Sequence, residues 1–279
     1  MATGFANKLI GKMNEAAQVI YHLPIGGHLI PLNTQLGKVI QIRFTGAIQC
    51  VGCGRALKKS YQQGYCFPCT QTLAACDICI VKPELCHFEQ GTCREPGWGE
   101  AHCMQPHYVY LANTSDLKVG ITRASNLPTR WIDQGATQAL PILQVKSRYI
   151  AGLVEVALAG HVKDKTNWRK MLQGSAEPLD LLAKRDEFIV KIDSWLHELR
   201  AKFPQDGLAP LADVRPRELH FPVLSYPTKL ISLSFDKTPQ IQGTLLGIKG
   251  QYLILDQGVL NIRNATGYEL ETSIPEMRD

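Results

Sequence analysis

Two cysteine pairs decide how the first half of this chain folds: CVGCG at residues 50–54 and CFPC at residues 66–69. Each pair presents two thiolates at one corner of a tetrahedron, and the 12 residues between Cys53 and Cys66 let the second pair complete a four-cysteine site. Gly54 follows the first pair, where the chain often turns with a positive φ that glycine adopts without steric cost. The spacing predicts a zinc ribbon with four ligands: Cys50, Cys53, Cys66 and Cys69.

A second group of cysteines follows within a short span, and we expect it to bind a second zinc ion. Its favoured ligands are Cys76, Cys79, Cys86 and Cys93. Histidine can replace a thiolate in such a site, so four nearby residues are alternatives to Cys93: His87, His102, Cys103 and His107. The other interpretation of this group is a set of ordinary buried thiols. An odd count of nine cysteines argues against a secreted disulfide framework.

Composition indicates a protein of two or three domains. The 279 residues are 45% hydrophobic and 20% charged, and no apolar stretch is long enough to span a membrane. The first residues, MATGFANK, lead into no apolar signal region, so we expect neither a signal peptide nor an anchor, and a cytoplasmic location that keeps thiols reduced. Net charge is +5, and residues 105–172 hold nine Lys or Arg against four acids, so the basic excess lies in the middle of the chain.

The pattern of elements predicts an α+β fold in four parts. Residues 1–49 contain a short amphipathic helix over 8–20 and strands over 37–48, and residues 50–104 form a cysteine-rich module organised by metal. Residues 105–204 form a three-stranded sheet with helices. Residues 205–279 begin with a Pro- and Ala-rich linker and continue as short strands of a small antiparallel β-barrel.

The middle part has the clearest local signals. Residues 107–112 and 117–121 alternate as two strands of a tight hairpin, and 141–145 is a third strand. Helices are expected from a cap at Ser125 or Asn126 through Asp133, and over three further ranges: 151–162, 167–172 and 178–203.

Two charged residues of this part need partners. Glu155 lies in an expected helix that is apolar on almost every face, where a carboxylate requires a metal, a cation or solvent. Arg130, beside Trp131, can pair with that carboxylate or bind phosphate in a fork geometry. A surface position for each is the alternative.

The same region resembles the GIY-YIG nuclease superfamily. The resemblance covers residues 105–172 and rests on YVYLA at 108–112, KVGITR at 118–123, and the arginine and glutamate just described. With the preceding cysteines and the phrase PTRWIDQGA at 128–136, the chain also resembles an uncharacterised bacterial family labelled as a domain of unknown function.

The superfamily resemblance implies roles by position. Gly120 matches the glycine of the second signature tripeptide, Arg130 the arginine that contacts phosphate, and Glu155 the ligand of a divalent metal. Lys118 stands where the second tyrosine is usual. Val109 stands where the first is usual, flanked by Tyr108 and Tyr110, the two candidates to aid proton transfer.

Three hypotheses follow. The favoured one is a zinc protein whose degenerate GIY-YIG-like cleft binds structured RNA or DNA without cutting, through Lys118, Gly120, Arg123, Arg130, Trp131, Lys163 and Arg169. The second is a Mg²⁺- or Mn²⁺-dependent endonuclease in which Glu155 holds the ion, Arg130 steadies the phosphate and a tyrosine moves the proton. The third is a zinc-stabilised protein-interaction module, and the C-terminal barrel is a further place for a protein partner.

Overall fold

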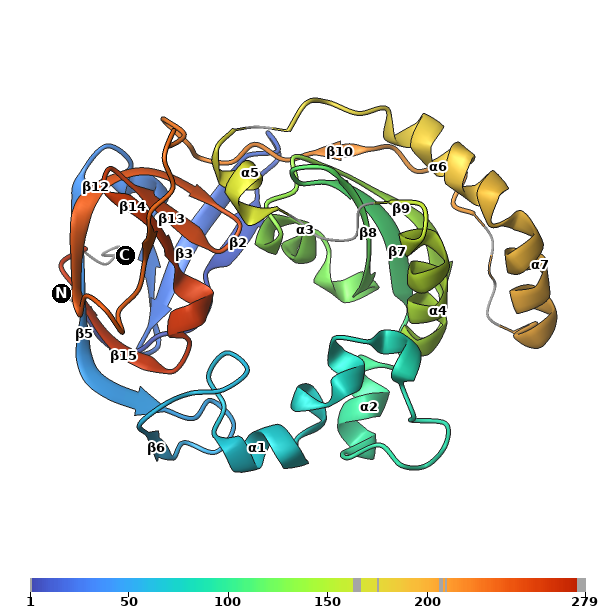
Figure 1. Ribbon diagram of the computed structural model, residues 1–279, viewed down its shortest axis with the longest axis horizontal. Helices are drawn as coiled ribbons and strands as arrows, with labels where there is room; N and C mark the ends of the chain where they lie inside the picture. The colour runs from blue at the N-terminus through green and yellow to red at the C-terminus, as the bar shows by residue number, and fades with distance from the viewer. Residues whose placement is uncertain (1, 163–166, 175, 206–207, 209, 275–279) are drawn as a thin grey trace.

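The computed structural model describes residues 2–162, 167–174, 176–205, 208 and 210–274. Its elements surround a common centre (Figure 1). One group of strands comes from both ends of the chain, blue and red in Figure 1, and a second sheet comes from the green middle segment. The cysteine-rich segment, cyan in Figure 1, joins the two groups along one side of the molecule.

The predicted hairpin is confirmed and lies inside a larger sheet. β7 (His107–Asn113) and β8 (Leu117–Arg123) pair antiparallel along their full lengths. β9 (Gln138–Val145) pairs with the other edge of β7, and the short β10 (Arg217–Glu218) pairs with β9. The order is β10-β9-β7-β8, so the sheet has four strands where the sequence predicted three, because Arg217, the last residue of the expected linker, and Glu218 after it pair with β9.

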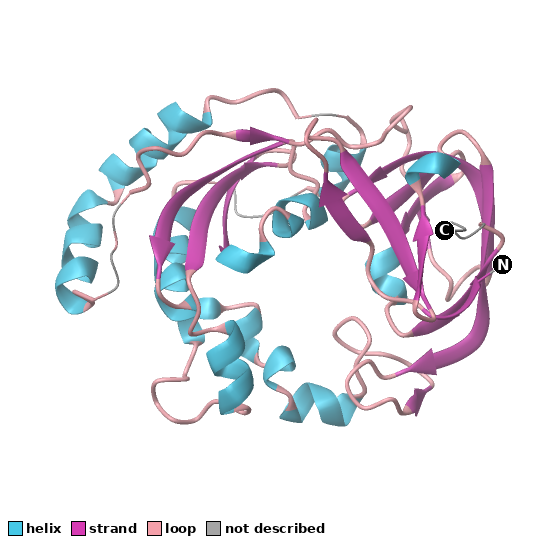
Figure 2. Cartoon of the chain, turned by 180° about the vertical axis from the view of Figure 1, so that it is seen from behind, coloured by secondary structure: helices cyan, strands magenta, loops and turns pink. Residues whose placement is uncertain are grey.

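Helices cover the face of this sheet that carries Val109 and Leu111. α4 (Arg148–Ala159) packs on β7 and β8, and its residues share a core with α6 (Leu181–Lys191) and α7 (Asp193–Lys202). Figure 2 shows these helices along the outer side of the sheet. None of the helices in the described residues is both long and apolar enough to cross a membrane.

The single helix expected over 178–203 is divided into α6 and α7 at Ile192. This residue is 3% exposed, and the turn there keeps both Phe188 and Leu196 buried in one core. The helix expected to end at Asp133 is also shorter than predicted. It is α3 (Thr129–Asp133), and Pro128 precedes it without any side-chain cap.

The prediction of a helix over 8–20 is wrong, because this segment contains β2 (Ile10–Met13) and the start of β3 (Val19–Ile25). The N-terminal part also contains β1 (Ala2–Phe5) and β4 (His28–Pro31). β2, β3 and β4 pair in order. In β3 every second residue is buried, which is the period of a strand and not of a helix. The strand expected over 37–48 is confirmed as β5 (Val39–Gln49).

The strands of the C-terminal part do not close into a barrel of their own. They are β11 (Ser232–Leu233), β12 (Gln240–Lys249), β13 (Tyr252–Leu255), β14 (Gly258–Asn261) and β15 (Tyr268–Thr272). The sheet order is β1-β15-β5-β12-β13-β14-β11, with β6 (Ala56–Leu57) paired to β5. β5 thus separates β12 from β15, so strands from both ends of the chain complete one sheet, although the sequence suggested that 1–49 and 205–279 lie apart.

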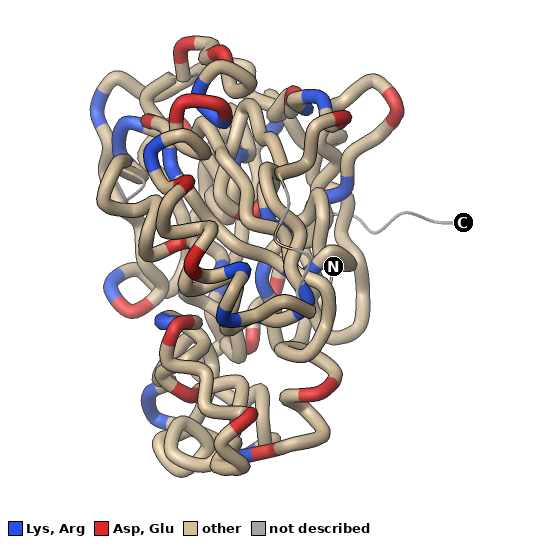
Figure 3. Tube along the Cα trace, turned by 90° about the vertical axis from the view of Figure 1, so that its right-hand side faces the viewer, with Lys and Arg blue, Asp and Glu red and all other residues tan. Residues whose placement is uncertain are grey.

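Charged residues do not gather into one basic face on the side of α6 and α7. Viewed from that side, Lys and Arg alternate with Asp and Glu along the trace (Figure 3). A site for an anionic partner has to be sought among local clusters.

Candidate functional site

The first four cysteines converge on one point where β5 leads into the cysteine-rich segment. The sulfur atoms of Cys50, Cys53, Cys66 and Cys69 all lie within 4.8 Å of one another. Cys66 caps α1 (Phe67–Thr72), its backbone N–H donates to Cys50 Sγ at 3.1 Å, and Cys69 N–H donates to Cys66 Sγ at 3.4 Å. No disulfide joins them. The four thiols form a tetrad compatible with zinc, as the spacing predicts.

The backbone favours the thiolate form of Cys50, whereas the hydrogen bond of Cys66 and then burial raise the pKa of Cys69. Burial raises the pKa of Cys50, but the N–H groups of Cys66, Cys53 and Gly52 lower it more, to about 6. Gly54 has φ +73, which confirms the predicted left-handed turn after the first pair.

Gly120 of β8 lies under a tyrosine ring. Tyr110 and Gly120 are direct partners across the hairpin. A Cβ atom on Gly120 would lie 2.6 Å from Tyr110 Oη and 2.7 Å from Cζ, so only glycine leaves room for the ring. Tyr110 is fully buried, and its ring packs edge-on against Trp131 with 6.1 Å between centroids.

Tyr110 belongs to a group of four polar side chains that we call the Arg130 cluster: Tyr110, Arg130, Gln134 and Glu155. With the Gln134 amide oriented to satisfy its neighbours, its nitrogen donates to Tyr110 Oη at 2.9 Å. Its oxygen then accepts from Arg130 Nε at 3.2 Å and from Nη2 at 3.1 Å.

Electrostatics place Glu155 of α4 beside this group. Burial lowers the pKa of Arg130, but Tyr110, Asp133 and Glu155 raise it, with a net increase. The pKa of Tyr110 is raised by burial first and also by Glu155, against the lowering effect of Arg130. Arg130 of α3 and Glu155 of α4 therefore interact electrostatically.

The strand register decides which hairpin residues face the cluster. Lys118 and Tyr108 lie on the same face as Tyr110, and both are half-buried. Val109 and Arg123 lie on the opposite face, toward α4. Of the two candidate tyrosines, Tyr110 is the one that hydrogen-bonds to Gln134, which in turn contacts Arg130.

Other residues expected to contact nucleic acid lie elsewhere. Trp131 is 2% exposed and belongs to the core beneath the cluster, so no base can stack on it. Arg169 lies over Trp168 of α5 (Trp168–Leu172), 4.4 Å from the ring centroid, and Trp168 in turn stacks on Tyr252. Lys163 lies outside the described residues.

A buried carboxylate, Asp133, follows Arg130 by one turn of α3, and the sequence analysis did not identify it. The side chain of Asp133 is 3% exposed and binds Lys8 Nζ at 2.5 Å. Gln251 Nε2 donates to it at 2.9 Å, and Arg263 Nη2 lies 3.8 Å away. These partners come from both ends of the chain, so no local pattern could have found them.

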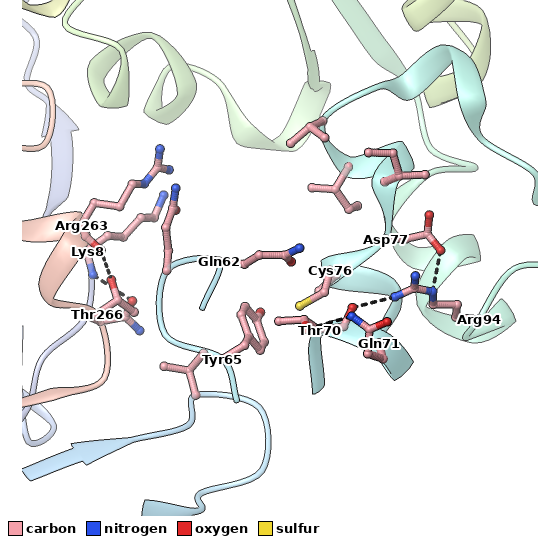
Figure 4. A pocket seen from close by; sticks show the side chains of 17 residues that line it. Lys8, Gln62, Tyr65, Thr70, Gln71, Cys76, Asp77, Arg94, Arg263 and Thr266 are labelled. Atoms are coloured by element: carbon pink, nitrogen blue, oxygen red, sulfur yellow. Dashed lines mark hydrogen bonds and ion pairs between the residues drawn. The ribbon is translucent and has the colours of Figure 1, made fainter. Parts of the chain in front are cut away.

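A pocket of about 790 Å³ opens next to this carboxylate. Lys8 and Arg263 line one side, and the Asp77–Arg94 ion pair lines the other (Figure 4). Gln62 and other amide side chains lie between them. Asp133 therefore lies beside the wall of the pocket that Lys8 and Arg263 form. Burial and then the charge of nearby Arg130 lower the pKa of Arg263.

The remaining cysteines separate into two places. Cys76 lines the large pocket, and its pKa is raised by burial and then by Cys50 and Cys66 of the first tetrad, against the lowering effect of Arg94. Cys79, Cys86, Cys93 and Cys103 instead line a cavity of about 10 Å³. Cys103, which the sequence suggested only as an alternative to Cys93, lines this cavity together with Cys93.

Three histidines were alternative ligands. His87 Nε2 lies 3.4 Å from Asp77 Oδ2, and these two residues with Cys79 place their ligand atoms within 4.8 Å of one another. His102 stacks on Trp98 with 4.0 Å between ring centroids. His107 is fully buried, and burial lowers its pKa to about 4.

Comparison with known proteins identifies a family but no characterised relative. A family model described as "Protein of unknown function (DUF2797)" matches residues 37–270. No curated protein matches the chain, and no solved structure matches it.

Proposed function

The chain belongs to the DUF2797 family, and from its site we propose that it is a zinc protein that binds structured RNA or DNA through phosphate contacts at the Arg130 cluster and the adjoining pocket. The first cysteine tetrad would hold a structural zinc ion. Binding without cleavage is the activity that the cluster supports best.

One observation carries the proposal. Lys8 and Arg263 pair with the buried carboxylate of Asp133 at the edge of a polar pocket, and Arg130 interacts electrostatically with both Asp133 and Glu155. Two carboxylates balance two of these three cations, so one net positive charge remains beside the pocket wall. Phosphate is the partner that such partly buried guanidinium groups bind in a fork geometry.

The geometry of Tyr110 argues against hydrolysis. A general base must accept a proton near neutral pH, and burial holds the pKa of this phenol above its ordinary value. Its hydroxyl is also occupied by Gln134. The tyrosine therefore supports the arginine and does not activate water.

A metal-dependent endonuclease remains the second candidate, because one observation favours it. Glu155 lies close enough to Tyr110 and Arg130 to affect the pKa of both, which is the pairing that the GIY-YIG resemblance implies. In that reading Glu155 would hold Mg²⁺ or Mn²⁺ beside the phosphate.

The experiment compares binding and cleavage in the same samples. Labelled tRNA, an rRNA stem-loop and duplex DNA are titrated with the wild type and with Arg130→Ala, Glu155→Gln and the control Glu198→Gln, with and without Mg²⁺ or Mn²⁺. Glu198 is an exposed acid on α7. We expect no cleavage, weaker binding by Arg130→Ala, and binding by Glu155→Gln that equals or exceeds the wild type, because a negative charge is removed.

Metal-dependent cleavage that Glu155→Gln abolishes would replace the binding proposal by the endonuclease. If the wild type binds no nucleic acid even at low salt, where phosphate contacts contribute most, both fail and the protein-interaction module becomes the better account.

A further inference from the structure

We propose that Cys79, Cys86, Cys93 and Cys103 bind a second zinc ion, and that this ion fixes the cysteine-rich segment to the N-terminal end of α4. The four residues line one cavity of about 10 Å³. This is roughly the volume of one water-sized sphere, so the space suits a single ion and excludes an organic ligand. The inference does not depend on the proposed function.

The four cysteines come from separate turns that border the cavity, and their sulfur atoms are more widely spaced than those of the first tetrad, so a bound ion would draw them together. Cys79 lies in the 3₁₀ turn η3 (Ile78–Ile80), and Cys86 caps η4 (Pro83–Leu85). Cys93 lies in the loop that follows, and Cys103 caps α2 (Pro96–His102). All are free thiols, and Cys79 and Cys103 are 8% and 3% exposed. These short turns offer little hydrophobic core, which is typical of segments that fold around a metal.

Cys76 is a poorer ligand than its spacing suggests. It lines the large pocket with Tyr65 and Thr70, and it is not among the residues around the small cavity. A CxxC pair usually supplies both thiols to one metal, but here only Cys79 of the pair lines the small cavity.

Asp77 and His87 approach Cys79 but have other partners. Asp77 accepts from the Cys79 N–H at 3.2 Å and pairs with Arg94 Nε at 2.7 Å. His87 Nδ1 lies 2.8 Å from Thr92 Oγ1. A metal held by the Asp77 carboxylate would have to displace the arginine, so we assign both residues to the hydrogen-bonded layer that orients the thiols.

The ion would act on α4 through Arg148, the first residue of this helix. Arg148 N–H donates to the Cys103 carbonyl at 2.8 Å, and its guanidinium donates to the carbonyls of Cys79 at 3.4 Å and Ile80 at 2.6 Å. Zinc bound by four thiolates carries net negative charge, which this cation partly balances. Two of the proposed ligands, Cys79 and Cys103, supply backbone carbonyls that accept hydrogen bonds from Arg148. The ion would therefore fix the start of α4, the helix that carries Glu155.

Metal content of the purified full-length chain tests the site. We expect about two zinc ions in the wild type, about one in Cys103→Ser and about two in the matched control Cys76→Ser. Cys103→His keeps a ligand, so it should retain about two, and its Co²⁺ form should show weaker sulfur-to-cobalt charge-transfer absorption than the wild type.

Other results would overturn the assignment. About two ions in Cys103→Ser and about one in Cys76→Ser would restore the set with Cys76. Loss of one ion in Asp77→Asn or His87→Ala would favour a mixed site, and about one ion in the wild type would remove the second site. If Cys103→Ser does not fold, the comparison of Cys103→His with Cys76→Ser still decides between the two sets.

Hydrogen exchange tests the effect on α4. Replacing Cys103 by Ser should speed amide exchange over residues 148–155, whereas Cys76→Ser should leave it as in the wild type. Equal protection of these residues in both variants would contradict the role in fixing α4, even if the second ion is present.

Discussion

Replacing Gly120 by alanine should both destabilise the protein and weaken its binding site. The added Cβ would lie 2.6 Å from Tyr110 Oη, 2.7 Å from Cζ and 3.1 Å from Cε2. Tyr110 is fully buried against Trp131 and hydrogen-bonded to Gln134, so its ring cannot simply rotate away. Overpacking of a filled core costs about 1–3 kcal/mol, and we expect about 2 kcal/mol here.

Urea unfolding followed by circular dichroism, at fixed free zinc, measures this loss. Gly97→Ala is the control, because Gly97 lies in the helix α2 with no heavy atom within 4 Å of an added Cβ. That change should be neutral or stabilising by up to about 1 kcal/mol. If Gly120→Ala unfolds at the same urea concentration as Gly97→Ala, the close contact between the glycine and the tyrosine ring is refuted.

Three further predictions concern the packing around the site. Gly152→Ala should cost about 2 kcal/mol and loosen the cysteine-rich segment in thermal unfolding, because its Cβ would lie 2.5 Å from Glu84 N. Gly160→Ala, at the C-terminal cap of the same helix and with only Ala157 O at 3.8 Å, should be neutral. Lys249 is fully buried, and burial lowers its pKa from the ordinary 10.5 to about 8. Between these two pH values the unfolded protein binds more protons than the folded protein, so the free energy of unfolding of the wild type, measured by urea titration, should rise with pH. Lys249→Met should abolish this rise, and a slope equal to the wild type would contradict it. Cys66→Ser should lose the first zinc and expose residues 50–73 to protease; an unchanged metal content would contradict the tetrad.

The features that the sequence predicted well are those set by residues close together in the chain. The zinc tetrad depends on two short pairs, and the hairpin of β7 and β8 depends on alternation around one turn. Each is fixed by local spacing and needs no knowledge of the rest of the fold.

The features that the sequence missed depend on distant segments. The expected barrel failed because β5 pairs with both β12 and β15, and no local pattern indicates that an N-terminal strand lies between them. The segment 8–20 was ambiguous, because Leu9, Ile10 and Met13 fit a helical period while Val19 begins a strand period.

The candidate site was predicted in part for the same reason. Arg130 and Glu155 could be identified by resemblance, but Lys8, Asp133 and Arg263 meet only in the folded chain. Trp131 was expected to contact nucleic acid, yet its large apolar ring is buried in the core.

The most direct test of the account is the salt dependence of nucleic-acid affinity for Arg130→Ala. Fluorescence anisotropy with labelled tRNA and duplex DNA gives the affinity over a range of salt concentrations. The control is Arg215→Ala, an exposed arginine outside the cluster. We predict that Arg130→Ala weakens binding roughly tenfold and reduces the slope of log affinity against log salt by about 1, as loss of one phosphate contact requires, while Arg215→Ala changes neither. Equal affinity and slope in wild type and Arg130→Ala would contradict the claim that this cluster binds phosphate.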